Sequence, residues 1–204
     1  MTHPASRAES SSVTSPLTDL RPPSVVASLR ELVAAEFKFG TIYADPPWDY
    51  SNRASRGAAR KHYRTMSFAQ IKNEPVADLA AERAHLHLWT TNGFLREALE
   101  LIQAWGFTYK SCFVWVKPDM GCGNYWRVSH EFLLLGVRGG LPFRNHSQRS
   151  WLSARRMEHS RKPGHVRMLV EQVSPGPYLE LYGRAEIPCS DWTIYGNQVE
   201  RRLF

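Results

Sequence analysis

The stretch Phe39-Gly40-Thr41-Ile42-Tyr43-Ala44-Asp45-Pro46-Pro47-Trp48 decides the fold. The apolar run over residues 39–43 predicts a buried strand. The two prolines end that strand, because neither can donate to a ladder and each fixes φ. We therefore expect an acid, two free carbonyls and an indole on a stiff turn at the carboxyl end of a strand, where ligands bind in open α/β sheets.

The turn carries groups that suit the chemistry of an aromatic amine. The exocyclic amine of adenine is a poor nucleophile, because its lone pair is delocalised into the ring. Acceptors at Asp45 and the Pro46 carbonyl would favour a pyramidal nitrogen and stabilise the positive charge that develops during methyl transfer. The Pro46-Pro47 unit limits reorganisation, and Trp48 offers a face on which the base can stack.

The alternative for this tetrapeptide is an ordinary turn with a solvent-facing acid and a core tryptophan. Asp-Pro and Pro-Pro are common turn signals. At background usage the tetrapeptide arises in roughly one chain of this length in several thousand, which favours the functional interpretation.

The composition is that of one folded domain preceded by a tail. The chain has 204 residues, 43% of them hydrophobic, and seven tryptophans. Residues 1–25 are rich in Ser, Thr, Pro and Ala and predict a disordered tail before a domain over residues 26–204. We find neither an apolar run of about 20 residues nor a secretory pattern, so we expect no membrane segment. Three widely spaced cysteines predict a reducing cytoplasm and no metal site.

The net charge of +7 is concentrated in two segments. Residues 53–64 hold Arg53, Arg56, Arg60, Lys61 and Arg64 and no acid, and residues 144–167 hold Arg144, Arg149, Arg155, Arg156, Arg161, Lys162 and Arg167 against Glu158 alone. Both segments are rich in Ser, Gly, Asn and His and are expected to be loops. They are either solvated basic loops or, as we favour, a surface that binds the phosphates of a nucleic acid.

Strands and helices are predicted to alternate along the chain. We expect helices at 26–37, 68–72, 93–105 and 164–173, and strands at 39–43, 85–89, 109–116, 132–137, 178–184 and 191–195. Ser67 is placed to cap the second helix, and His85 and His87 are expected to be structural. This alternation predicts an α/β fold with a mostly parallel, doubly wound sheet.

The tetrapeptide Asp45–Trp48 resembles the signature of the MT-A70 family of adenine-N6 methyltransferases. The similarity extends from about Phe37 to Gln198 and includes a Tyr-x-x-Met-Ser element at residues 63–67 and the pair His130-Glu131. The resemblance implies a Rossmann-like class I methyltransferase fold and S-adenosylmethionine as cofactor. It also implies a permuted motif order, in which Asp45 precedes the cofactor-binding strand that holds Glu180.

The resemblance also implies a set of site residues. The catalytic residues would be Asp45, Pro46, Pro47 and Trp48. The cofactor would be bound by Asp45, Lys162, Glu180, Tyr182, Gly183, Arg184, Asn197 and Gln198, with Lys162 on the carboxylate of its methionine moiety. The nucleic acid would contact Tyr50, Arg53, Arg60, Lys61, Tyr63, Arg155 and Arg156. Taken singly, several of these have ordinary alternatives: an exposed lysine, a strand-to-glycine turn, a surface arginine and a C-terminal turn.

The expected function is therefore methyl transfer from S-adenosylmethionine to N6 of adenine in nucleic acid. A compact chain with no recognisable RNA module favours DNA over RNA. The alternatives are an RNA methyltransferase, a catalytically silent nucleic-acid-binding subunit, and methylation of a protein or glutamine amine. The intact tetrapeptide and cofactor residues disfavour the silent subunit, and the basic segments disfavour a protein substrate. A homodimer or a second subunit is left open.

Overall fold

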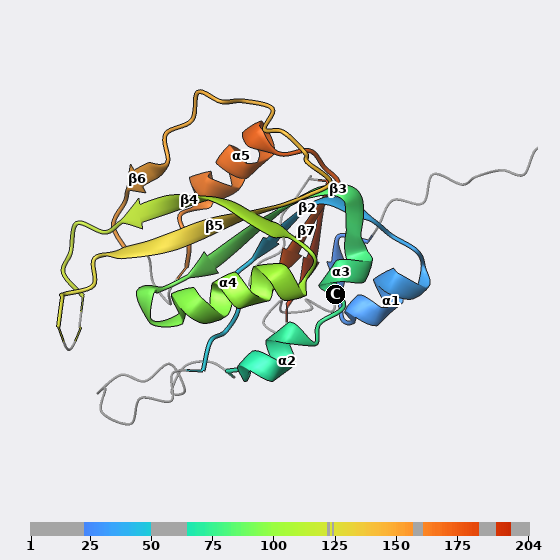
Figure 1. Ribbon diagram of the computed structural model, residues 1–204, viewed down its shortest axis with the longest axis horizontal. Helices are drawn as coiled ribbons and strands as arrows, with labels where there is room; N and C mark the ends of the chain where they lie inside the picture. The colour runs from blue at the N-terminus through green and yellow to red at the C-terminus, as the bar shows by residue number, and fades with distance from the viewer. Residues whose placement is uncertain are drawn as a thin grey trace, which may run out of the picture.

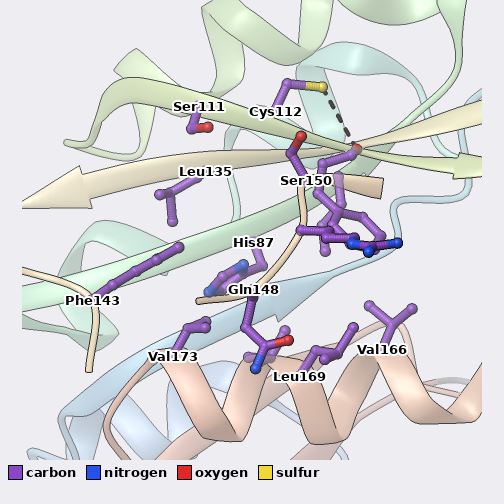
Figure 2. A pocket seen from close by; sticks show the side chains of 14 residues that line it. His87, Ser111, Cys112, Leu135, Phe143, Gln148, Ser150, Val166, Leu169 and Val173 are labelled. Atoms are coloured by element: carbon purple, nitrogen blue, oxygen red, sulfur yellow. Dashed lines mark hydrogen bonds between the residues drawn. The ribbon is translucent and has the colours of Figure 1, made fainter. Parts of the chain in front are cut away.

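The computed structural model describes residues 23–49, 65–121, 123, 125–156, 161–183 and 191–196. Their strands form one eight-stranded sheet in the order β1-β8-β7-β2-β3-β5-β4-β6 (Figure 1). The strands are β1 (Val25–Val26), β2 (Phe39–Ala44), β3 (Ala80–Thr90), β4 (Thr108–Val116), β5 (His130–Arg138), β6 (Trp151–Ser153), β7 (Tyr178–Leu181) and β8 (Trp192–Tyr195). Only the two pairs that β5 makes, with β3 and with β4, are antiparallel. The predicted mostly parallel sheet is confirmed.

Helices cover both faces of this sheet (Figure 1). They are α1 (Leu29–Ala34), α2 (Phe68–Lys72), α3 (Val76–Leu79), α4 (Leu95–Ala104) and α5 (Gly164–Val173), with a 3-10 turn η2 at Asn92–Phe94. Side chains of α1 to α4 share one apolar core with Ile42 and Leu86. Val166 and Val170 of α5 share a second core with Tyr43. Neighbouring residues of β2 thus enter opposite cores, as the two-residue period of a strand requires.

The centre of the sheet contains a topological switch point. Strands β2 and β7 are parallel neighbours, but the chain leaves β2 towards β3 and leaves β7 towards β8, on opposite sides. Asp45 directly follows β2, and its amide donates to the Leu181 carbonyl at the end of β7, 3.4 Å away. Tyr182 directly follows β7. The crevice at such a point is where open α/β sheets bind ligands.

The structure corrects several element boundaries. The helix expected at 26–37 is α1, because Val25 and Val26 pair with β8 and Ser28 caps the helix by accepting from Arg30. The strand expected at 85–89 begins earlier, at Ala80. The strand expected at 178–184 ends at Leu181, because Tyr182 adopts a φ of 65°. Helices α2 and α5 have the predicted bounds.

Residues 1–22, most of the predicted tail, lie outside the described part. Within that part, no helix has the length and apolar character needed to cross a bilayer.

Candidate active site

Asp45 lies on a turn whose backbone is held from both sides. The Pro46 carbonyl accepts from the Trp48 amide at 2.9 Å, and the Pro47 carbonyl accepts from the Met66 amide at 2.9 Å. The expectation that both carbonyls are free is therefore wrong: the chain's return beside the turn at Met66 occupies one, and a local turn occupies the other. A carbonyl oxygen has two lone pairs, so Pro46 can still accept one further hydrogen bond.

Trp48 fixes this turn to the core. The indole is 6% exposed and stacks on Phe94, with ring centroids 5.2 Å apart and an interplanar angle of 13°. Its Nε1 donates to the Trp89 carbonyl at 3.4 Å. Phe94 occupies one face of the indole, and at 6% exposure the ring leaves little surface on which a base could stack. Trp48 instead stiffens the segment that carries Asp45.

Lys162 forms an ion pair with Asp45. Its Nζ donates to both carboxylate oxygens, at 2.8 and 2.7 Å. The side chains are only 13% and 24% exposed, and the Trp89 ring centroid lies 5.5 Å from the ammonium. Lys162 stands just before Pro163 and the start of α5, and this placement brings the lysine to the carboxyl end of β2. Two residues predicted for one site thus meet there.

Two further charged side chains, Glu131 and Lys117, extend this ion pair along the sheet. Glu131 Oε2 lies 3.4 Å from Lys162 Nζ, and the other oxygen of Glu131 accepts from Lys117. Lys117 follows β4 directly, and Glu131 is the second residue of β5. The four side chains form a row of alternating charge. Sequence reasoning expected Glu131 to support the site wall but gave no role to Lys117; its one local signal is its place before Pro118, where β4 ends.

The row favours the charged forms of its two central members, Lys162 and Glu131. Burial alone would lower the pKa of Lys162, but Asp45 and Glu131 outweigh it and raise the pKa above its ordinary value. Burial would raise the pKa of Glu131, but Lys162 and Lys117 outweigh it and lower that pKa. Burial prevails at Lys117, whose pKa is lowered. Asp45 therefore faces a firmly protonated ammonium.

A second buried carboxylate stands at the end of β7. Glu180 pairs with Arg167 of α5, and burial raises the pKa of the Glu180 carboxyl although Arg167 opposes the shift. Arg167 also lies over Trp192, with its Cζ 5.3 Å from the ring centroid. Arg167 was counted with the second basic loop; it belongs instead to α5, which begins at Gly164, and it neutralises Glu180.

The residues after Glu180 make a tight turn at the switch point. Tyr182 has a φ of 65°, a conformation that costs a residue with a side chain and that is found most often at functional sites. The Gly183 amide donates to the Tyr195 carbonyl at 3.0 Å, and a Cβ on Gly183 would lie 2.4 Å from Ile194 Cγ2. Glycine is therefore required where β7 and β8 converge.

The other predicted site residues fall into two groups. Arg155 and Arg156 are exposed, and Arg156 donates to the Val128 carbonyl at 3.2 Å. Tyr50, Arg53, Arg60, Lys61, Tyr63, Arg184, Asn197 and Gln198 lie outside the described residues. No group of three or more metal-binding side chains occurs within the described ranges.

A mostly parallel sheet with one reversed strand, an acid after a central strand and a tight turn after its neighbour are consistent with the Rossmann-like fold of class I methyltransferases. The model of the MT-A70 family matches residues 39–198, and the chain belongs to that family.

Individual relatives agree with this assignment. The chain is 28% identical over 169 residues to the Type II methyltransferase M.MunI of Mycoplasma sp, covering 72% of each chain. It is 27% identical to the human N(6)-adenosine-methyltransferase catalytic subunit METTL3, over 80% of this chain and 28% of that protein. It is 25% identical to the N(6)-adenosine-methyltransferase MT-A70-like protein of Arabidopsis thaliana, over 79% of this chain and 24% of that protein. The match thus spans about a quarter of the human and plant relatives.

Proposed function

We propose that this protein transfers a methyl group from S-adenosylmethionine to N6 of adenine in nucleic acid, with DNA as the favoured substrate. The observation that carries the proposal is the Asp45–Lys162 ion pair at the switch point between β2 and β7. Membership of the MT-A70 family supplies the reaction class, and the pair supplies a place for it.

The charged groups of the site match those of the cofactor. The methionine end of S-adenosylmethionine carries one ammonium and one carboxylate, and Lys162 and Asp45 offer one partner for each. Glu180, at the neighbouring strand end, offers carboxylate oxygens for ribose hydroxyls. Arg184, Asn197 and Gln198 complete the set by resemblance to the family. When bound, the cofactor supplies a methyl group on a positively charged sulfur.

Asp45 can accept a hydrogen bond from the target amine once Lys162 has another anion to bind. A carboxylate that accepts a hydrogen bond from the amine favours a pyramidal nitrogen with a localised lone pair. It also stabilises the positive charge that develops on that nitrogen during methyl transfer. The second lone pair of the Pro46 carbonyl offers a further acceptor. Trp48, stacked on Phe94, keeps both acceptors in place, so little reorganisation is needed at the moment of transfer.

The substrate follows from charge and from the relatives. A base inside a duplex cannot reach Asp45, so the adenine must be unpaired or be rotated out of its stack. The basic segments, in which the structure describes exposed side chains at Arg144, Arg149, Arg155, Arg156 and Arg161, are suited to phosphate. Of the relatives named above, the type II methyltransferase is the one matched over most of its own length, and this favours DNA.

The proposal is tested by tritiated-methyl transfer to DNA and RNA oligonucleotides of matched sequence, each single- and double-stranded. The labelled products are digested to nucleosides and identified by mass spectrometry. We expect N6-methyladenine, with more label in DNA than in RNA. Label on cytosine or on added protein would contradict the proposal. A separate measurement of S-adenosylmethionine affinity identifies a silent subunit, which would show no binding.

A further inference from the structure

The loop between β4 and β5 projects from the same edge of the sheet as Asp45. Strands β3 and β4 both run antiparallel to β5, so the carboxyl ends of β2, β3 and β4 share one edge. Residues 117–121 and 125–129 leave the sheet there, and Figure 1 shows this segment reaching out beyond the strands. The loop therefore stands beside the candidate active site.

The root of this loop is fixed to the site. The Lys117 amide donates to the Ser129 carbonyl at 2.7 Å, and the Lys117 ammonium binds Glu131 in the charged row that ends at Asp45. Further out, the Gly121 amide and the Arg156 guanidinium both donate to the Val128 carbonyl, at 3.0 and 3.2 Å. The base of the loop is thus a defined structure, tied both to the site and to an arginine of the second basic segment.

The outer part of the loop exposes two adjacent aromatic side chains. Tyr125 is 95% exposed and Trp126 is 89% exposed, more than any other large hydrophobic side chain that the structure describes. Leaving such rings in water is unfavourable, and adjacent exposed apolar side chains that form one patch are a feature of interaction sites. Arg127 follows them directly, and Asp119 is the only acid in residues 117–129.

These features select a nucleic acid rather than a protein as the occupant. Two rings of about 150–250 Å² each, even together with Met120 of the same loop, which is 80% exposed, fall short of the roughly 800 Å² per partner of a standard-size protein interface. Adjacent rings flanked by arginines suit a strand of unpaired bases, since bases stack on aromatic faces and phosphates bind guanidinium groups.

We propose that Tyr125 and Trp126 form a stacking platform for unpaired bases next to the target adenine, with Arg127 and Arg156 on the neighbouring phosphates. This inference rests on the proposed function, because it supposes a nucleic-acid substrate. Tyr125 lies eight residues from Lys117, so an extended chain reaches at most about 29 Å from the root of the loop. At about 3.4 Å per nucleotide, this reach corresponds to roughly eight nucleotides of a stacked strand, counted from the root of the loop beside the target.

The test uses the full chain and single-stranded DNA with one target adenine. The fluorescent base 2-aminopurine is placed at successive positions on either side of that adenine. We expect its fluorescence to be quenched at positions on one side, within about eight nucleotides. The double variant Tyr125→Ala/Trp126→Ala should lose this quenching and raise the Kd for DNA roughly tenfold or more, at unchanged S-adenosylmethionine affinity. Arg127→Gln should lower the salt slope of binding by about one.

Tyr109→Ala is the matched control, because Tyr109 is 42% exposed near the opposite end of β4. It should bind DNA as the wild type does. If the double variant shows the same quenching and the same Kd for DNA as the wild type, the stacking platform is ruled out and the proposed function is unaffected. Dissociation of a dimer with unchanged DNA affinity would also overturn it and assign the loop to a protein contact. If the wild type binds neither DNA nor RNA, the proposed function fails together with this inference.

Discussion

The ammonium of Lys162 donates to both carboxylate oxygens of Asp45, although 117 residues separate the two in the chain. Lys162 therefore occupies the acceptors that a target amine would need. The carboxylate of S-adenosylmethionine would give Lys162 another anion to bind. Lys162 would keep its interaction with Glu131, whose Oε2 lies 3.4 Å from the ammonium. With Lys162 so engaged, Asp45 would have one carboxylate oxygen for the ammonium of the cofactor and the other for the amine of the base.

Removing the ammonium should weaken cofactor binding. Lys162→Met deletes a charge-assisted hydrogen bond worth about 1.5–3 kcal/mol, so the Kd for S-adenosylmethionine, measured by calorimetry, should rise roughly 10- to 150-fold. The control is Lys72→Met, which removes a cation from the surface pair with Glu100, where the side chains are 41% and 52% exposed. Equal affinities in the wild type and Lys162→Met would show that Lys162 does not bind the cofactor.

Lys117→Met should lower the free energy of unfolding by on the order of 3 kcal/mol, because it leaves the buried Glu131 carboxylate without its nearer cation. Urea unfolding at neutral pH measures this loss. Lys72→Met should cost less than about 1 kcal/mol, as expected for an exposed pair. Adding Glu131→Gln to Lys117→Met should restore part of the stability, since the unpaired charge is then removed. A further loss in the double variant would contradict this explanation.

Stability should fall as the pH is lowered below about 6.5. His87 is buried, and burial together with His85 lowers its pKa from 6.5 to about 3; burial likewise lowers the pKa of His85. The Ser174 hydroxyl lies 2.8 Å from both rings, and His85 Nε2 lies 2.9 Å from the Leu141 carbonyl. As the pH falls below the unfolded pKa of about 6.5, the unfolded chain takes up these protons and the folded chain does not, so the free energy of unfolding decreases.

One such histidine should cost about 1.4 kcal/mol between pH 7.5 and 5.5. The measurement is urea unfolding of the wild type and of His87→Gln at both pH values. We expect a smaller pH dependence in the variant, whatever its stability at pH 7.5. The same pH dependence in both proteins would exclude His87 as a source.

The sequence predicted those parts of the fold that depend on local pattern. The apolar run before Asp45 is β2, all six of whose residues are buried. Ser67 caps α2 through Gln70, and α5 has its predicted bounds. A pair of prolines, a helix cap and a helical period each depend only on residues that are close in the sequence. They can therefore be recognised without knowledge of the rest of the chain.

Contacts between distant segments were not predictable in the same way. The position of Lys117 beside Glu131 depends on the register of β4 against β5, and Phe94 reaches Trp48 only through the packing of η2. Strand β6 has three residues inside a basic segment, too few to show a period. Resemblance to the family named Asp45 and Lys162 separately; their ion pair became visible only in the structure.

The most direct test of the account is methyl transfer by Asp45→Asn. This variant keeps the size of the side chain and removes the carboxylate charge. Radiolabelled transfer to an adenine-containing oligonucleotide should give N6-methyladenine with the wild type and a rate at least about a hundredfold lower with Asp45→Asn, while thermal unfolding shows that the variant is folded. A folded Asp45→Asn that methylates adenine at the wild-type rate would contradict the role of Asp45 and the mechanism built on it.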